Sequence, residues 1–174
     1  MISAQAKQSR ANALKKSRYQ IKPGGVVEYS DEWFTLPEIV KALGEFDLDP
    51  SAGPMNHARL NLRASEGQNG LSQEWSGRVW LNPPYSTLPK WLEKMQAHAN
   101  GICLVTARTE TQWFQAVAKT CSALFFYKGR MKFLRPDGTK NNIPCGSVLV
   151  AWGGANVEAL RNSGLPGVLA LIES

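Results

Sequence analysis

An asparagine followed by two prolines and a tyrosine is the segment of this sequence with the clearest chemistry. Asn82-Pro83-Pro84-Tyr85 directly follows the apolar residues 79–81. An exocyclic amino group on a base is a poor nucleophile, because its lone pair is delocalised into the ring. The side-chain oxygen of Asn82 and the backbone carbonyl of Pro83 are two acceptors that can bind both amino hydrogens and restore that lone pair. Two successive prolines hold such acceptors in place before a substrate arrives.

Tyr85 adds a flat face on which an extruded base can stack, worth roughly 1–3 kcal/mol per base. An amine activated in this way reacts directly with the methyl sulfonium of S-adenosylmethionine, so the chemistry needs neither an acid–base pair nor a metal. The tetrapeptide alone leaves the acceptor open, because it also marks methyltransferases that act on RNA bases or on protein glutamine. A purely structural alternative is that Pro83 and Pro84 end a strand and Asn82 caps the next helix.

The elements that position this segment alternate between strands and helices. The apolar pattern predicts strands at 46–48, 79–81, 102–106, 123–127 and 147–152, a weaker strand around 59–63, and helices at 37–43, 88–99 and 111–120. This alternation predicts an open α/β sheet covered by helices. Ligands bind beyond the carboxyl ends of the strands in such sheets, where the polar segments 49–53 and 82–86 emerge.

Composition narrows the class of protein. The 174 residues suit one domain, and a hydrophobic share of 43% with 20% charged residues is normal for a globular protein. No apolar run approaches the roughly 20 residues of a membrane span. The cysteines Cys103, Cys121 and Cys145 form no CxxC pair, so neither a disulfide framework nor a zinc site is indicated, and we expect reduced thiols in a cytoplasmic protein.

The positive charge is concentrated at the start of the chain. Six basic residues precede the first acidic residue, Glu28, and the remaining 14 basic residues equal the 14 acidic ones. The six are Lys7, Arg10, Lys15, Lys16, Arg18 and Lys22. Residues 1–27 are therefore predicted to be a basic, flexible N-terminal arm on a neutral catalytic domain, 28–174. Such an arm favours contact with a polyanion, although a solvated terminus is the simpler alternative.

Several segments in one order carry a family resemblance. From about Asp31 to Trp152 the chain resembles the phage-type DNA N6-adenine methyltransferases, the Dam-like family of phages and prophages. The matching segments are 31–35, 46–52, 69–71 with Trp75, 82–86, 107–111 with Trp113-Phe114, 128–133 and 144–147. The resemblance implies adenine N6 in double-stranded DNA as the acceptor and S-adenosylmethionine as the cofactor. It leaves open the recognition sequence, and whether the enzyme protects phage DNA, pairs with a nuclease or regulates transcription.

The resemblance also implies a fold and a set of site residues. The fold is a pared-down, Rossmann-like S-adenosylmethionine-dependent methyltransferase sheet flanked by helices, because only 33 residues separate Asp49 from Asn82. The catalytic residues are those of the tetrapeptide, and no metal is expected. The implied cofactor contacts are Trp33, Thr35, Asp47, Asp49, Pro50 and Ala52. The usual glycine-rich turn is replaced by Ser51-Ala52-Gly53, and only Glu66 and Glu74 are candidates for the acidic partner of the cofactor ribose.

Residues for DNA contact are expected after two later strands. They are Arg108, Trp113, Lys128, Arg130 and Lys132, although Trp113 fits a place in the core equally well. The basic stretch 128–140 suits a hairpin or loop that follows the phosphates, with a solvated loop as the alternative. Two rival functions remain: a methyltransferase for RNA bases or protein glutamine, and a non-catalytic DNA-binding relative.

Overall fold

The computed structural model describes residues 19–21, 27–29, 33–135 and 138–173. By its internal contacts the chain divides into two units, Met1–Glu32 and Trp33–Ser174. In the first unit, β1 (Tyr19–Ile21) pairs antiparallel with β2 (Val27–Tyr29). The rest of the predicted basic arm lies outside the described residues, so its role stays a prediction.

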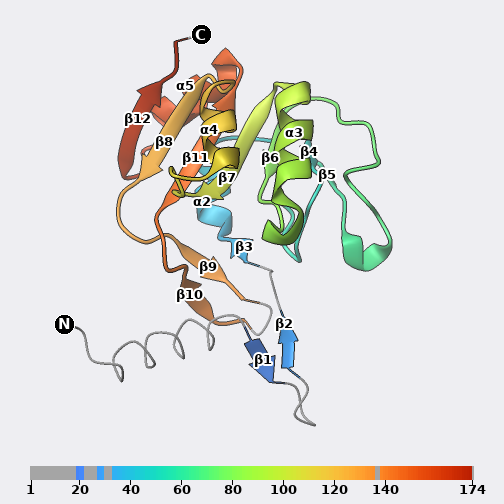
Figure 1. The fold of residues 1–174 in the computed structure, drawn as a ribbon. Helices are drawn as coiled ribbons and strands as arrows, with labels where there is room; N and C mark the ends of the chain where they lie inside the picture. Colours follow the sequence, from blue (N-terminus) through green and yellow to red (C-terminus); the bar gives the residue numbers. More distant parts are fainter. Residues whose placement is uncertain (1–18, 22–26, 30–32, 136–137, 174) are drawn as a thin grey trace, which may run out of the picture. The chain divides into compact units, whose positions relative to one another are not determined.

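The second unit is built on a seven-stranded mixed sheet with the order β12-β8-β11-β7-β6-β4-β5 (Figure 1). The strands are β4 (Leu48–Asp49), β5 (Leu60–Asn61), β6 (Val79–Leu81), β7 (Gly101–Thr106), β8 (Ala123–Tyr127), β11 (Ser147–Trp152) and β12 (Gly167–Leu171). Neighbouring strands from β5 to β7 are parallel, whereas β11, β8 and β12 pair antiparallel with their neighbours. The predicted α/β sheet is confirmed, and β12 is a strand that the sequence pattern did not predict.

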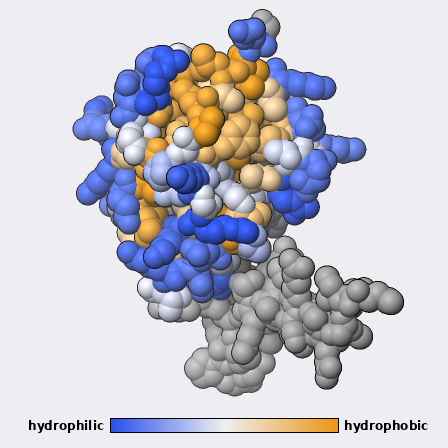
Figure 2. Space-filling view, turned by 90° about the vertical axis from the view of Figure 1, so that its left-hand side faces the viewer, coloured by the Kyte–Doolittle hydropathy of each residue, from blue (hydrophilic) through white to orange (hydrophobic). Residues whose placement is uncertain are grey.

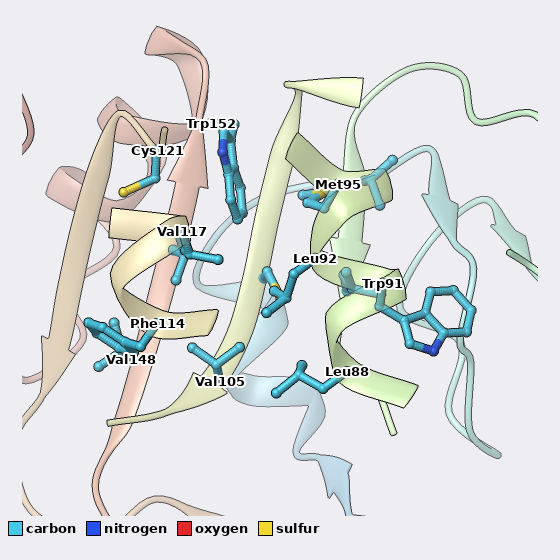
Figure 3. Close-up of a cluster of buried hydrophobic side chains, with 14 of the residues drawn as sticks. Leu88, Trp91, Leu92, Met95, Val105, Phe114, Val117, Cys121, Val148 and Trp152 are labelled. Atoms are coloured by element: carbon cyan, nitrogen blue, oxygen red, sulfur yellow. The ribbon is translucent and has the colours of Figure 1, made fainter. Parts of the chain in front are cut away.

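Helices cover both faces of this sheet. The helices α3 (Leu88–His98) and α4 (Gln112–Ala118) lie on one face, and α2 (Pro37–Lys41) and α5 (Gly154–Asn162) lie on the other (Figure 1). Figure 3 shows side chains of α3 and α4 gathered around Val105 of β7. In β6, Val79 and Leu81 join this cluster while Trp80 joins the opposite one. Burial on both faces explains why the central strands are apolar without alternation.

The domain is pared down between β4 and β6. The described residues 50–78 contain β5 and one short 3₁₀ helix, η1 (Ala64–Glu66), but no α-helix. The connection from Asp49 to Asn82 is therefore short, as the spacing predicts, and it consists mostly of loops.

A second, smaller sheet brings the basic stretch next to the start of this unit. Its strand order is β10-β9-β3, formed by β3 (Phe34–Thr35), β9 (Lys132–Leu134) and β10 (Lys140–Asn142). All its pairs are antiparallel. The basic stretch thus supplies β9 and the first residue of β10, and β9 pairs with β3.

The outer edge of the large sheet is apolar. β12 pairs with β8, and Figure 2 shows this side of the molecule, where apolar residues gather and Val168 and Leu171 are exposed. Among the described residues, no helix has the length and apolar character needed to cross a membrane.

Candidate active site

The turns after β4 and β6 meet at the carboxyl edge of the parallel strands. β4 and β6 are adjacent, with Leu48 paired with Val79. Ser51 Oγ donates a hydrogen bond to the backbone carbonyl of Asn82, 3.1 Å away. Gly70 approaches the same turn so closely that a Cβ there would lie 2.0 Å from the carbonyl oxygen of Pro50. The two polar segments predicted to meet therefore do so, and the 69–71 loop packs against them.

A third segment, 33–35, joins them from the start of the unit. Asn82 Nδ2 donates to the backbone carbonyl of Trp33 at 2.5 Å. A Cβ on Gly53 would lie 2.3 Å from the ring of Phe34, so only glycine permits this approach. The hydrogen bond to Trp33 fixes which end of the Asn82 amide is the donor. Its Oδ1 is left as an acceptor to which no described residue donates.

The prolines and Tyr85 continue this edge. Pro83 is buried and Pro84 is half-buried before the 3₁₀ helix η2 (Tyr85–Thr87). The Tyr85 side chain is 36% exposed, but its hydroxyl points inward and accepts a hydrogen bond from the Thr106 N–H, 2.6 Å away at the end of β7. Burial of that end raises the pKa of the Tyr85 hydroxyl, which therefore stays neutral. The ring is anchored at one end and partly open at the other.

Two buried polar side chains lie in the segments that surround Asn82. Asp49 is 2% exposed, and burial raises its pKa to about 7, although the Ser51 N–H and the charge of Arg63 oppose the shift. Thr35 is 1% exposed, and no described residue bonds to its Oγ1. Buried polar groups are normally paired, and a buried carboxyl with a raised pKa is typical of functional sites, so Thr35 and Asp49 are both suited to a polar ligand.

A family model now decides the class of the protein. The model described as DNA N-6-adenine-methyltransferase (Dam) matches residues 25–158. The chain belongs to the Dam family. It is therefore an S-adenosylmethionine-dependent DNA N6-adenine methyltransferase, as the sequence resemblance predicts. No curated protein and no solved structure matches the chain.

One predicted cofactor contact of this Dam-family enzyme, Asp47, lies away from Asn82. Asp47 lies at the amino end of β4, where its Oδ2 accepts from the Arg78 N–H at 2.7 Å and its Oδ1 is 3.6 Å from Arg59. The turn predicted to bind the cofactor leaves the opposite end of the strand, so Asp47 lies away from Asn82. Pro50 and Ala52, in contrast, are buried in the turn itself.

Glu66 and Glu74, the two candidates for the acidic partner of the cofactor ribose, make no described contact with the segments around Asn82. Glu66 and Glu74 are exposed, and Glu66 lies 3.9 Å from Arg63. The residues that leave β5 are Leu62 and Arg63, and Arg63 Nε donates to the Gly53 carbonyl at 3.0 Å. Arg63 thus links the end of β5 to the turn after β4.

The predicted DNA contacts divide into two groups. Lys128, Arg130 and Lys132 are exposed on and before β9, as a phosphate-binding surface requires. Arg108 is exposed and paired with Glu110 at 2.7 Å. Trp113, in α4, is half-buried and packs against the core, which favours its structural alternative.

Other possible ligand sites are separate from Asn82. A cavity of about 290 Å³ lies between α2 and residues 56–59. Its lining shares no residue with the segments 33–35, 49–53, 69–71 and 82–86. Within the described ranges, no three His, Cys, Asp or Glu side chains cluster closely enough to hold a metal.

Sequence reasoning missed two contacts that shape the site. The hydroxyl of Ser51 bonds to Asn82, and the Trp33 carbonyl orients the Asn82 amide. Both residues lie within segments that carry the family resemblance. Only the folded structure shows that they touch Asn82, because 31 and 49 residues separate them from it.

Proposed function

We propose that this enzyme methylates adenine N6 at specific sites in double-stranded DNA, with Asn82 Oδ1 and the Pro83 carbonyl binding the two amino hydrogens. The observation that carries this proposal is the hydrogen bond from Asn82 Nδ2 to Trp33. It directs the amide so that Nδ2 faces the protein and Oδ1, to which no described residue donates, is the end offered to an amino group. An amide held the other way would present a donor and repel the substrate.

The acceptors act by preorganisation. The amino nitrogen becomes tetrahedral and more positive as it attacks, so bonds from its hydrogens to fixed oxygens strengthen in the transition state. The Ser51 bond holds the Asn82 backbone, and the two prolines restrict the residues that follow. Removing one such preorganised partner in other enzymes lowers kcat about 10²–10³-fold.

The target base must leave the duplex to reach these acceptors. Base extrusion requires a few kcal/mol, and stacking on an aromatic ring offsets part of it. Tyr85 is suited to this role, because its hydroxyl is anchored to Thr106 while part of the ring stays exposed. A tethered ring needs little further ordering when the base arrives.

The residues around Asn82 fit the cofactor of the family. S-adenosylmethionine supplies an electrophilic methyl group on a sulfonium. In our proposal the Thr35 hydroxyl, which has no partner among the described residues, and the segment at Trp33 bind its amino-acid end. Asp49, Pro50 and Ala52 form the turn beneath it. A buried carboxyl group suits a cationic ligand, since the opposite charge favours its ionised form.

The DNA backbone is expected to lie along the basic hairpin. Lys128, Arg130 and Lys132 are exposed there, with Arg108 at the end of β7 as a further contact. The resemblance to phage-type enzymes supports modification of phage or prophage DNA as the biological setting.

The test compares Asn82→Ala with Asn162→Ala, an exposed asparagine at the end of α5. Each protein receives labelled S-adenosylmethionine with DNA, RNA or protein, and the DNA product is digested and its methylated base identified. Wild type and Asn162→Ala should form N6-methyladenine, whereas Asn82→Ala should lose at least about 10²-fold in turnover while binding DNA and cofactor normally. Methylation of RNA or protein alone, or full turnover by Asn82→Ala, would overturn the proposal. A non-catalytic relative would also gain no thermal stability from S-adenosylmethionine.

A further inference from the structure

A buried arginine links the basic hairpin to the segment that holds Asn82. Arg135 follows β9, and its backbone N–H and carbonyl bond to Thr139 and Gly138 in the turn towards β10. Its side chain is only 6% exposed, and the guanidinium carbon lies 4.5 Å from the centre of the Trp33 ring. Arginine is rarely buried at the end of a strand, because removing its charge from water is costly. The contact with Trp33 joins the hairpin to the segment 33–35.

Among the described hairpin residues, both Arg135 and Phe133 contact the Trp33 ring. Phe133 meets the ring edge-on, with centroids 6.2 Å apart and planes at 83°. The neighbouring backbones are paired as well, with Phe34 opposite Leu134. A cation over the face of a tryptophan and an aromatic edge against it both restrict how the ring can turn.

The other end of Trp33 contacts the catalytic amide. Its backbone carbonyl accepts the 2.5 Å hydrogen bond from Asn82 Nδ2. The ring and the carbonyl belong to one residue, so a ring that is held on two sides limits the directions in which the carbonyl can point. A continuous series of contacts thus runs from the hairpin turn through Arg135 and Trp33 to Asn82.

We infer that Arg135 is a positioning residue: by clamping Trp33, it holds the Asn82 amide in the orientation that adenine N6 requires. This inference rests on the proposed function of Asn82. It also couples the hairpin to the chemistry, because the strands joined by this turn carry the exposed Lys132 and Lys140. DNA bound along the hairpin and the base held at Asn82 are then aligned by the same contact.

The first test is the single-turnover methylation rate at saturating DNA and cofactor. Arg135→Gln should lower this rate roughly tenfold, equivalent to about 1.4 kcal/mol, with little change in the Kd of either ligand. Arg135→Lys should recover part of the rate, since lysine keeps the charge but not the flat guanidinium. Asn142→Ala alters an exposed side chain of the same hairpin, at the end of β10, and should leave the saturated rate intact.

The second test is a double-mutant cycle with Asn82→Asp. Aspartate keeps side-chain oxygens but has no amide N–H to donate to Trp33, so the proposed link is already broken in that variant. If Arg135 acts through Asn82, Arg135→Gln should have no further effect on the rate in the Asn82→Asp background. Rate losses that simply multiply would overturn the inference.

A spectroscopic readout separates positioning from general loss of structure. The Asn82 side-chain amide signal, assigned by its disappearance in Asn82→Asp, should shift in Arg135→Gln and stay in place in Asn142→Ala. An unshifted signal would count against the link even if activity fell. A wild type that forms no N6-methyladenine overturns the proposed function and this inference together, whereas an active wild type with independent Arg135 and Asn82 effects overturns this inference alone.

Discussion

Replacing Asp49 by asparagine should make the protein more stable at neutral and basic pH. Asp49 is 2% exposed, and burial raises the pKa of its carboxyl from 3.8 to about 7. Between these two values the unfolded chain has released its proton while the folded chain still holds it. Stability therefore falls as pH rises from about 4 to about 7, because the unfolded state binds fewer protons.

The size of the effect follows from the same two values. Each pKa unit corresponds to about 1.36 kcal/mol, so the shift of Asp49 from 3.8 to about 7 amounts to about 4 kcal/mol of lost stability above pH 7. Asparagine cannot ionise, and its side-chain oxygen can still accept the bond that the Ser51 N–H makes to Asp49 Oδ1 at 3.1 Å. We expect Asp49→Asn to match wild type near about pH 4 and to exceed it by up to about 4 kcal/mol near about pH 8.

Urea unfolding followed by tryptophan fluorescence, at several values between about pH 4 and about pH 8, measures this difference directly. Other carboxylates titrate in both proteins, so their contributions cancel when the two are compared. Asp47→Asn is the control, because it removes an acidic group from the half-buried, amino-terminal end of the same strand. A stability difference between Asp49→Asn and wild type that stays constant across the range would refute the reasoning.

Three further outcomes are expected. Calorimetry should show cofactor affinity rising from about pH 6 to about pH 8 in wild type but not in Asp49→Asn, because an ionised carboxylate attracts the cationic cofactor. Deleting residues 1–22, which carry six basic residues, should reduce the salt slope of DNA binding by up to about 5, and an unchanged slope in a filter-binding titration would assign the arm another task. Arg78→Gln should lower the free energy of unfolding by about 2–4 kcal/mol in urea, because Arg78 donates to Asn156, to the Glu45 carbonyl and to the Leu43 carbonyl; an unaffected midpoint would contradict this.

Much of the sheet is predictable because its central strands are buried on both faces. The apolar runs at β6, β7 and β11 stand out for that reason, and every residue in them is buried. The C-terminal pair α5 and β12 gives a weaker signal. α5 buries Val157 and Leu160 together with the polar Asn156, and β12 is largely exposed, so neither has a clear apolar period.

The site is less predictable than the sheet, because it depends on register and on contacts between distant residues. Asp47 and Asp49 look alike in the sequence, two residues apart. The pairing of Leu48 with Val79 sets the end of the sheet at which each one lies, and it leaves only Asp49 near Asn82. No local sequence pattern predicts the hydrogen bond between Asn82 and Trp33. Trp33 directly precedes β3, whose position is set by its pairing with the distant strand β9.

A methyltransferase domain without a helix between β4 and β5 needs another way to keep the turn after β4 rigid, where we propose that the cofactor binds. Glycines that allow very close contact serve this purpose. Gly53 lies against the Phe34 ring and Gly70 against the Pro50 carbonyl, so neighbouring segments fix the turn from both sides. Arg63 completes the support by donating to the Gly53 carbonyl. A side chain at Gly53 or Gly70 would push these segments apart, so activity should fall in Gly53→Ala and Gly70→Ala even though neither glycine touches the substrate in our proposal. The segments that hold Asn82 are therefore positioned by backbone contact, where a larger domain would use packed helices.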